Sequence, residues 1–252
     1  MVFRKLFARA AEPEPQLYSL PAGQRVYAIG DIHGRRDCLD TLIGMIDADD
    51  EVRGRVDTTL VLLGDLIDRG ADSRGVVERA MLLTTSPKCV LLMGNHEEIL
   101  IRVWEGDRKA AGLFHRVGGR ETLLSYGVSE AEYDACDLGD LADLVSARVP
   151  VEHIAFMRGF ADQWQCGDYL FVHAGIRPGV PLDAQRDSDL RWIRREFLDD
   201  PRDHGVMVVH GHSITEAVDE QPNRIGIDTG AFASGKLTAL GIEGTETWVL
   251  ST

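Results

Sequence analysis

The chain has 252 residues, of which 44% are hydrophobic and 27% charged, so it can bury the core of one large domain or of two small ones. Its formal net charge of −14 argues against a general nucleic-acid binder, which normally carries a basic face, but still allows a local basic pocket for an anionic substrate. The four cysteines lack C-x-x-C spacing, which argues against a zinc ribbon and favours small buried side chains in a reducing, cytoplasmic location.

The N-terminal segment differs from the rest of the chain. Residues 1–15 are basic, and their apolar stretch is too short and too interrupted for a secretory signal. We expect them to form a flexible arm, with a surface-binding amphipathic turn as the alternative, and we expect residues 16–252 to form a single domain. No apolar run approaches the roughly 20 residues of a membrane span, so we expect no transmembrane segment.

A short apolar run ending in glycine and a polar turn occurs three times in the first 100 residues. Strand-like residues 26–29 and 59–63 precede helical patterns over 36–47 and 73–84, and the run KCVLLMGNHE precedes a helix from about Glu97. This alternation predicts an α/β fold. Ligands in such folds bind beyond the carboxyl ends of the strands, so we expect the three polar turns at one sheet edge.

The middle of the chain changes character. Residues 102–159 are charged, helical in pattern and punctuated by glycine, which predicts a small helical cap inserted into the domain. Strands resume with DYLFVHAGI, which contains His173, and with GVMVVHGHS, which contains His210 and His212. The last three apolar segments, in residues 224–232, 236–244 and 245–252, are expected to form an antiparallel set.

Polar side chains gather at the ends of five predicted strands. A single aspartate in a glycine turn usually caps a helix, so the argument depends on the recurrence of the pattern. The groups are carboxylates, an amide and imidazoles without a cysteine, which suits a divalent metal such as Mn, Fe or Zn. The residues concerned are Asp31, His33, Asp65, Asp68, Arg69, Asn95, His96, His173, His210 and His212.

The motifs GDIHG, GDLIDRG, GNHE, VHAG and GHS, in this order, resemble those of the phosphoprotein phosphatase family of dinuclear metallophosphoesterases. The similarity is closest to its bacterial and phage lambda phosphatase-like branch and extends over residues 26–240. It implies a two-sheet β-sandwich flanked by helices. It also implies a phosphatase in which a hydroxide bridging two metals, Mn²⁺ being expected and Fe or Zn possible alternatives, attacks the phosphorus.

The resemblance also implies a role for each metal-binding position. Of the two imidazoles in HGHS, the family position favours His212, which leaves His210 at the strand end or behind the ligands. The expected ligands are Asp31, His33 and Asp65 for the first metal, and Asp65 (bridging), Asn95, His173 and His212 for the second.

Four further residues are implied in catalysis. His96 is expected to act as the general acid, oriented by Asp68, and Arg69 to bind the substrate phosphate. The tryptophan and arginine of LRWIRREF match a Trp-x-Arg of the same branch, so Arg194 is the expected second phosphate-binding arginine, with Arg195 left open.

The substrate prediction depends on two features. The acid Asp68 before Arg69 and the short spacing between His173 and His212 favour a phosphomonoesterase. We therefore predict a serine/threonine-type or dual-specificity protein phosphatase, acting on a phosphorylated protein or a small phosphoester. The alternative is a symmetrical diadenosine-polyphosphate hydrolase, where HAGI and IDTG also occur. A non-catalytic metal-binding module is disfavoured because every matched position is filled. Oligomeric state is left open.

Overall fold

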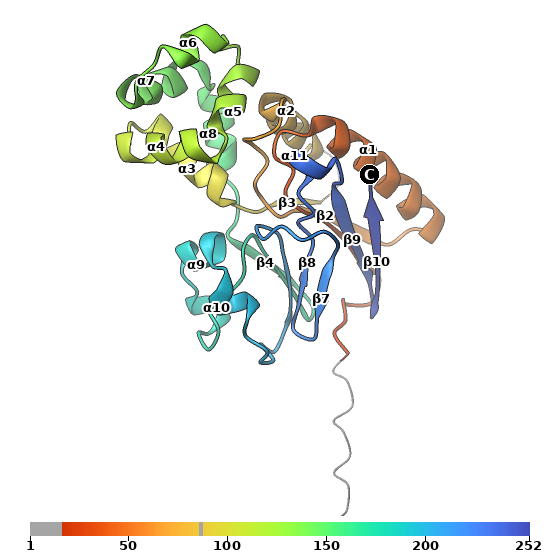
Figure 1. Cartoon of the computed structure of the whole chain (residues 1–252). Coiled ribbons are helices and arrows are strands. Elements are labelled where there is room, and N and C mark those ends of the chain that lie inside the picture. The colour runs from red at the N-terminus through yellow and green to blue at the C-terminus, as the bar shows by residue number, and fades with distance from the viewer. Residues whose placement is uncertain (1–16, 86–87) are drawn as a thin grey trace, which may run out of the picture.

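Two five-stranded sheets form the centre of the molecule, whose computed structural model describes residues 17–85 and 88–252 (Figure 1). In spatial order the first sheet contains β10 (Glu246–Ser251), β9 (Thr238–Glu243), β1 (Gln24–Ile29), β2 (Asp57–Leu62) and β3 (Cys89–Leu91). The second contains β4 (Gln163–Cys166), β5 (Tyr169–Val172), β6 (Met207–His210), β8 (Arg224–Gly226) and β7 (Asp219–Gln221).

The central strands of each sheet are parallel. Strands β1, β2 and β3 run in one direction, while β9 pairs antiparallel with β1, and β10 antiparallel with β9. In the second sheet β5, β6 and β8 are parallel, and β4 and β7 are antiparallel edge strands. This arrangement brings the carboxyl ends of the parallel strands in each sheet to a common edge, where ligands bind in α/β folds.

The sheets pack face to face through an apolar layer, which explains why β1 is apolar on both of its faces. Val26 and Ala28 of this strand belong to the same buried cluster as Phe171 of β5. The intervening Tyr27 and Ile29 belong to a second cluster, formed with helices on the other face. Burial on both faces is typical of strands in parallel sheets, and here it fixes the two sheets as one sandwich.

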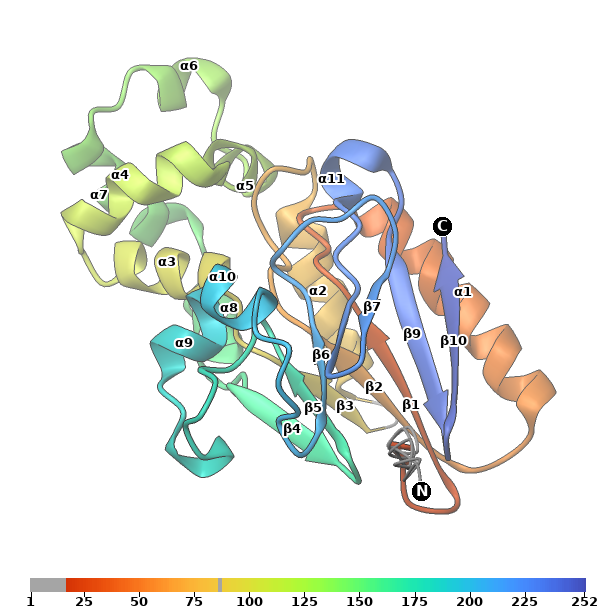
Figure 2. The same cartoon turned by 60° about the horizontal axis from the view of Figure 1, so that its bottom comes forward.

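Helices cover the outer faces of the sandwich (Figures 1 and 2). Those on the first sheet are α1 (Arg36–Arg53) and α2 (Ser73–Leu83), and those on the second are α9 (Asp187–Trp192) and α10 (Arg195–Leu198), after a short turn of 3-10 helix (Leu182–Ala184). Helix α3 (Asn95–Trp104) follows β3, and α11 (Ala231–Ser234) leads from the second sheet to the first. None of the helices in the two described ranges is long and apolar enough to cross a membrane.

Five helices over residues 108–158 form a separate group, called the cap from here on. As a group they pack on α3 and on α2, and they stand away from the sheets (Figures 1 and 2). They are α4 (Arg108–Val117), α5 (Gly119–Ser125), α6 (Glu130–Asp134), α7 (Leu138–Arg148) and α8 (Val151–Arg158). The helical character expected for this region is confirmed, whereas the division into arm, domain and cap stays a prediction, and the expected arm 1–15 lies outside the described residues.

The predicted fold class, two sheets flanked by helices, is confirmed, with two local differences. Helix α1 extends beyond residue 47 to Arg53, because an ion pair between Arg53 and Asp49 and the packing of Arg53 on Trp248 stabilise turns that lack an apolar face. The expected antiparallel set at the C-terminus is wrong in one strand. Strand β8 joins the second sheet, parallel to β6, and only β9 and β10 form the antiparallel pair.

Candidate active site

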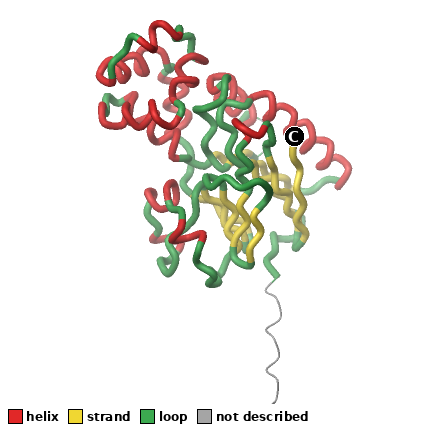
Figure 3. Tube along the Cα trace, viewed as in Figure 1, coloured by secondary structure: helices red, strands yellow, loops and turns green. Residues whose placement is uncertain are grey.

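Loops meet between the cap and the sheets (Figure 3). Most candidate residues belong to loops, whereas Asn95 and His96 begin α3 and His210 ends β6. The turn after β1 is hydrogen bonded to the turn after β2, since the N–H groups of Ile32 and His33 both donate to the Asp65 carbonyl oxygen, at 3.1 and 2.9 Å. The turn after β2 meets the start of α3, where the His96 N–H donates to the Asp65 carboxylate at 3.1 Å. The prediction that the three polar turns lie at one edge is therefore confirmed.

The backbone of these loops is unusual. Five non-glycine residues in the described ranges have a positive φ, and all five are candidate site residues. They are His33 (45°), Asp65 (49°), Asp68 (71°), Arg69 (67°) and His212 (62°). Left-handed backbone costs a non-glycine residue about 1 kcal/mol or more, and such conformations cluster where side chains must be aimed. The loops are thus shaped to bring side chains together, at the expense of backbone stability.

A first group of metal-binding atoms lies around one oxygen of Asp65. The Nε2 atoms of His33 and His96 are 3.6 and 3.7 Å from Asp65 Oδ2, and all three residues are buried. His33 Nδ1 donates to the Ile67 carbonyl oxygen at 2.7 Å, which leaves the lone pair of its Nε2 directed at Asp65. A carboxylate with two imidazoles is a donor set that suits a divalent cation.

A second group uses the other oxygen of Asp65. His173 Nε2 lies 3.4 Å from Asp65 Oδ1, 3.1 Å from Asn95 Oδ1 and 3.2 Å from His212 Nδ1. His173 Nδ1 donates to the Leu63 carbonyl oxygen at 2.8 Å, so His173 Nε2 carries no proton and is an acceptor. The Asn95 oxygen beside it is also an acceptor. Two acceptors this close, with no proton between them, fit a cation that both would bind. The two groups together form a potential dinuclear site with Asp65 between them.

The protonation of these groups suits metal binding. Burial lowers the pKa of His33 to about 3 and that of His212 to about 2, and it also lowers the pKa of His173. Burial alone would raise the pKa of Asp65, but the four surrounding histidines outweigh it and keep that pKa below its usual range. Neutral imidazoles and an ionised carboxylate are the forms that ligate metals.

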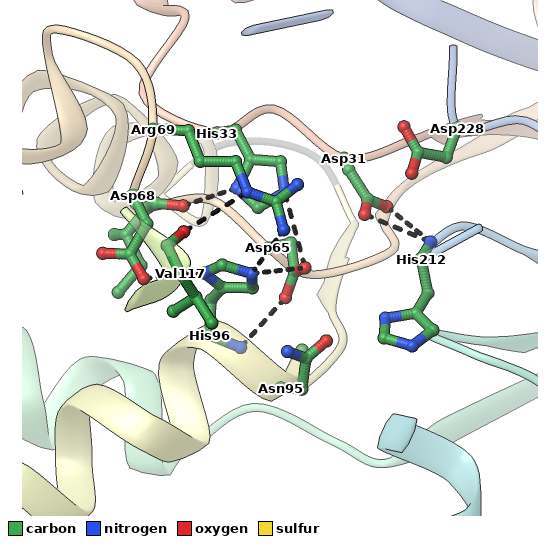
Figure 4. A network of polar contacts seen from close by, with 12 residues as sticks. Asp31, His33, Asp65, Asp68, Arg69, Asn95, His96, Val117, His212 and Asp228 are labelled. Carbon is green, nitrogen blue, oxygen red and sulfur yellow. Dashed lines mark hydrogen bonds and ion pairs between the residues drawn. The ribbon is translucent and has the colours of Figure 1, made fainter. Parts of the chain in front are cut away.

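Asp31 lies in the site but belongs to neither group of three. Its carboxylate oxygens accept the His212 N–H at 3.0 and 3.1 Å and lie beside Asp228 (Figure 4). Burial, and then the charge of Asp228, raise the pKa of Asp31 well above its usual range. Asp228 Oδ2 is itself buried without a hydrogen-bond partner among the described residues. Asp228 had no assigned role, although its IDTG turn follows the same apolar-to-polar pattern as the assigned turns.

His96 and Asp68 form the pair that the sequence predicts. His96 Nδ1 lies 2.6 Å from Asp68 Oδ2, and the hydroxyl of Thr122, from cap helix α5, donates to the other Asp68 oxygen at 2.5 Å. Burial lowers the pKa of His96, but the carboxylates of Asp65 and Asp68 outweigh it and raise the pKa to about 8. At neutral pH this imidazole can therefore hold a proton, as a general acid must.

Arg69 is held between the site and the cap (Figure 4). Its guanidinium lies 2.9 Å from His33 Nε2 and 3.1 Å from His96 Nε2, and it donates to the Val117 carbonyl oxygen at 3.3 Å. The Arg69 N–H donates to the carbonyl oxygen of Gly118 at 3.0 Å. A Cβ at position 118 would lie 2.8 Å from Arg69 atoms, which explains the glycine there. A cationic donor thus points into the centre of the site.

Arg194 lies exposed at the start of α10. Burial lowers the pKa of His212, and the nearby charge of Arg194 adds to this effect, which places the guanidinium near the second group. Trp192, two residues earlier, donates its indole N–H to Glu98 of α3 at 3.1 Å, and this bond holds the segment that carries Arg194 close to α3. Arg195 is exposed on the same short helix, and none of the bonds above involves it.

The structure also places two residues for which the sequence predicted no definite role, Glu97 and His210. Glu97 had no role, yet it is fully buried, and its carboxylate accepts N–H groups of Asp65 (2.9 Å), Leu66 (2.8 Å) and Gly94 (3.1 Å). The signal was the Glu of GNHE, which resembles an ordinary helix cap. His210 packs on Phe197 and lies outside both groups, whereas His212 belongs to the second.

Comparison with known proteins places this site in a family. Residues 24–232 match the Metallophos family, described as calcineurin-like phosphoesterase. A symmetrical bis(5'-nucleosyl)-tetraphosphatase of Ralstonia nicotianae is 33% identical over 84% of this chain and 87% of its own. An asymmetrical bis(5'-nucleosyl)-tetraphosphatase of Anoxybacillus flavithermus is 25% identical over 84% of this chain and 88% of its own.

Solved structures agree on the fold. One, provisionally described as a diadenosine tetraphosphatase, has a TM-score of 0.63 and 22% identity over 93% of this chain and 98% of its own. Another, a cold-active protein tyrosine phosphatase, has a TM-score of 0.58 and 18% identity over 98% of this chain and 89% of its own. At such identities these likenesses show the metallophosphoesterase fold alone.

The predicted serine/threonine-type protein phosphatase is wrong, because the sequence relatives are named as tetraphosphatases. The prediction depended on Asp68 and on the short spacing between His173 and His212. The observed partners of Asp68 are His96 and Thr122, and neither contact involves the group that follows the phosphate. The presence of Asp68 therefore does not distinguish a protein substrate from a nucleotide.

Proposed function

Since the chain belongs to the calcineurin-like phosphoesterase family, we propose that it hydrolyses a phosphoanhydride bond of a dinucleoside polyphosphate, with symmetrical cleavage. The observation that carries this proposal is the 33% identical relative, named as a symmetrical tetraphosphatase, which matches 84% of this chain. The relative named as asymmetrical supports the same class of substrate but a different scissile bond.

The donor set supports two divalent cations as cofactors. His33 and Asp65 line one position, with the protonated His96 beside it, Asp65, His173 and His212 line the other, and Asn95 lies beside the second. When bound, such cations lower the pKa of a water molecule and neutralise charge on phosphate oxygens. We keep Mn²⁺ as the proposed metal, with Fe or Zn as alternatives, and Asp31 as a further ligand of the first position.

The chain's own residues have separable tasks in this reaction. Arg69 and Arg194 would bind phosphate oxygens of the polyphosphate, for which the planar guanidinium is suited. His96, held by Asp68, would donate a proton to the departing oxygen. In a phosphoanhydride the departing group is a nucleoside phosphate, which is a weaker base than the alkoxide of a serine ester. His96 would consequently contribute less here than in a phosphomonoesterase.

Product analysis with diadenosine tetraphosphate and added Mn²⁺ tests the proposal. Anion-exchange chromatography should show ADP as the product of symmetrical cleavage, and a chelator should abolish its formation. Release of ATP with AMP would instead indicate cleavage at the asymmetrical position. Absence of turnover, together with release of phosphate from a phosphopeptide, would overturn the proposal.

Two finer expectations belong with this proposal. Membership of the phage lambda phosphatase-like branch stays a prediction, since the relatives described above carry tetraphosphatase names. A cytoplasmic location also stays a prediction. It is supported by the four cysteines, all free, of which Cys38 and Cys166 are buried.

A further inference from the structure

Two apolar side chains that are at least partly exposed lie at the rim of the candidate site, whose other groups are mostly charged or polar. Phe232 of α11 is half-buried, and Ile214, in the loop after β6, is 53% exposed. A Cβ at Gly230 would lie 3.1 Å from Ile214 Cγ2, so Ile214 packs directly on the turn that begins α11. We call Phe232 and Ile214 the apolar rim.

Within the apolar rim, Phe232 touches Arg69, one of the two proposed phosphate-binding residues. The guanidinium carbon of Arg69 lies 4.8 Å from the centroid of the Phe232 ring. The ring also meets His33 edge to face, with centroids 5.6 Å apart and planes at 87°. A group bonded to a phosphate that Arg69 holds would therefore lie close to the Phe232 ring.

The element that carries the ring is short and firmly held. Arg35 donates to the Ala231 carbonyl oxygen at 2.8 Å, and the Ser234 hydroxyl bonds to the carbonyl oxygens of Thr229 and Gly230, both at 2.9 Å. In Figures 1 and 2, α11 stands across the site loops from the cap. A ring fixed in this way loses little conformational freedom when a ligand stacks on it.

We propose that Phe232 and Ile214 form a nucleobase subsite, in which the base nearest the bound phosphates stacks on the Phe232 ring and packs against Ile214. This inference rests on the proposed function, which supplies a substrate with a base beside its phosphates. Aromatic rings accept every nucleobase because all bases have a flat π face. The alternative role of the ring is to hold Arg69, and the test separates the two roles.

The first test compares a substrate with bases to one without. In F232L the ratio of kcat/KM for diadenosine tetraphosphate to kcat/KM for inorganic tripolyphosphate should fall roughly 5- to 100-fold, the range expected for one lost base stack. F232Y should restore the ratio. The same substitution at a half-buried phenylalanine outside the rim, F156L, should leave it at the wild-type value. Equal losses on both substrates in F232L would overturn the subsite and assign the ring to Arg69.

A second test needs no turnover. Calorimetric titration should show that the wild-type protein binds ADP more tightly than pyrophosphate, and that F232L loses this preference while its melting temperature stays close to wild type. Equal affinities in the wild-type protein would overturn the subsite. If diadenosine tetraphosphate is not hydrolysed but the ADP preference exists and requires Phe232, the proposed function fails and the subsite stands.

Discussion

The substitution Glu97→Gln tests how the turn that carries Asp65 is held. The buried carboxylate accepts three backbone N–H groups, two on Oε2 from Asp65 and Gly94 and one on Oε1 from Leu66. An amide offers only one oxygen. In the orientation that preserves more hydrogen bonds, the amide oxygen takes the place of Oε2 and accepts from Asp65 and Gly94. The amide NH₂ group then faces the Leu66 N–H, so that two donors face each other.

The expected magnitude follows from these contacts. A hydrogen bond to a charged group contributes about 1.5–3 kcal/mol, and an unsatisfied buried donor costs a similar amount, so E97Q should lower the free energy of unfolding by about 2–3 kcal/mol. For a domain of this size each kcal/mol shifts the melting temperature by about 2–4 °C, which gives a fall of roughly 4–12 °C. If Asp65 shifts by about 1 Å as a result, kcat can fall on the order of 10²-fold.

Thermal unfolding followed by circular dichroism measures the stability change, and metal content with steady-state kinetics measures the effect on the site. Glu105→Gln is a matched control at the C-terminal end of the same helix, because Glu105 is 50% exposed and its ion pair with Arg158 contributes at most about 1 kcal/mol. An E97Q protein with wild-type melting temperature and wild-type activity would refute the role assigned to Glu97.

Three other outcomes are expected. Gly118→Ala should destabilise the protein by about 1–3 kcal/mol and raise KM, because φ at this position is 107° and a Cβ would press on Arg69. Chemical denaturation measures the change in stability and steady-state kinetics the change in KM, and unchanged values of both would contradict the contact. His96→Ala should lower kcat roughly 10²–10⁴-fold on alkyl phosphates but less on diadenosine tetraphosphate, whose leaving group needs less protonation; equal losses would argue against general acid catalysis. Removal of divalent metal with a chelator should lower the melting temperature of the wild-type protein, since a ligand at about 100 times its Kd stabilises a fold by about 2.7 kcal/mol. The melting temperature of the Asp65→Ala variant should be the same with and without the chelator.

The central strands and their polar turns were predictable because the signal is local. Each strand is followed within a few residues by glycine and by polar side chains, and recurrence of oxygen and imidazole groups indicated a potential metal-binding edge. The strand at residues 224–226 was assigned to the wrong sheet because a short apolar run does not encode its partner. Its pairing with β6 is fixed by packing of residues far apart in the chain.

Other features were hidden for different reasons. A glutamate at the start of a helix predicts an ordinary cap, and only burial shows that Glu97 holds the turn of Asp65. Positive φ at non-glycine residues has only a weak sequence signal, the enrichment of aspartate and histidine in that region, which does not locate the five positions. The substrate was hidden because the motifs contain the residues that we propose bind phosphate, whereas the apolar rim that we propose for the base lies outside them, at Ile214 and Phe232.

The left-handed residues of the site also bear on how this chain evolves. Glycine would adopt the same backbone at His33, Asp65, Asp68, Arg69 and His212 with less strain, but all of these side chains except Arg69 are buried, and their removal would leave cavities and unpaired partners. Relief of backbone strain and loss of packing therefore oppose each other, and stability alone does not favour glycine here. The identity of each side chain, by contrast, matters for the proposed chemistry, so a survey of substitutions at these five positions would separate active from inactive descendants of this chain.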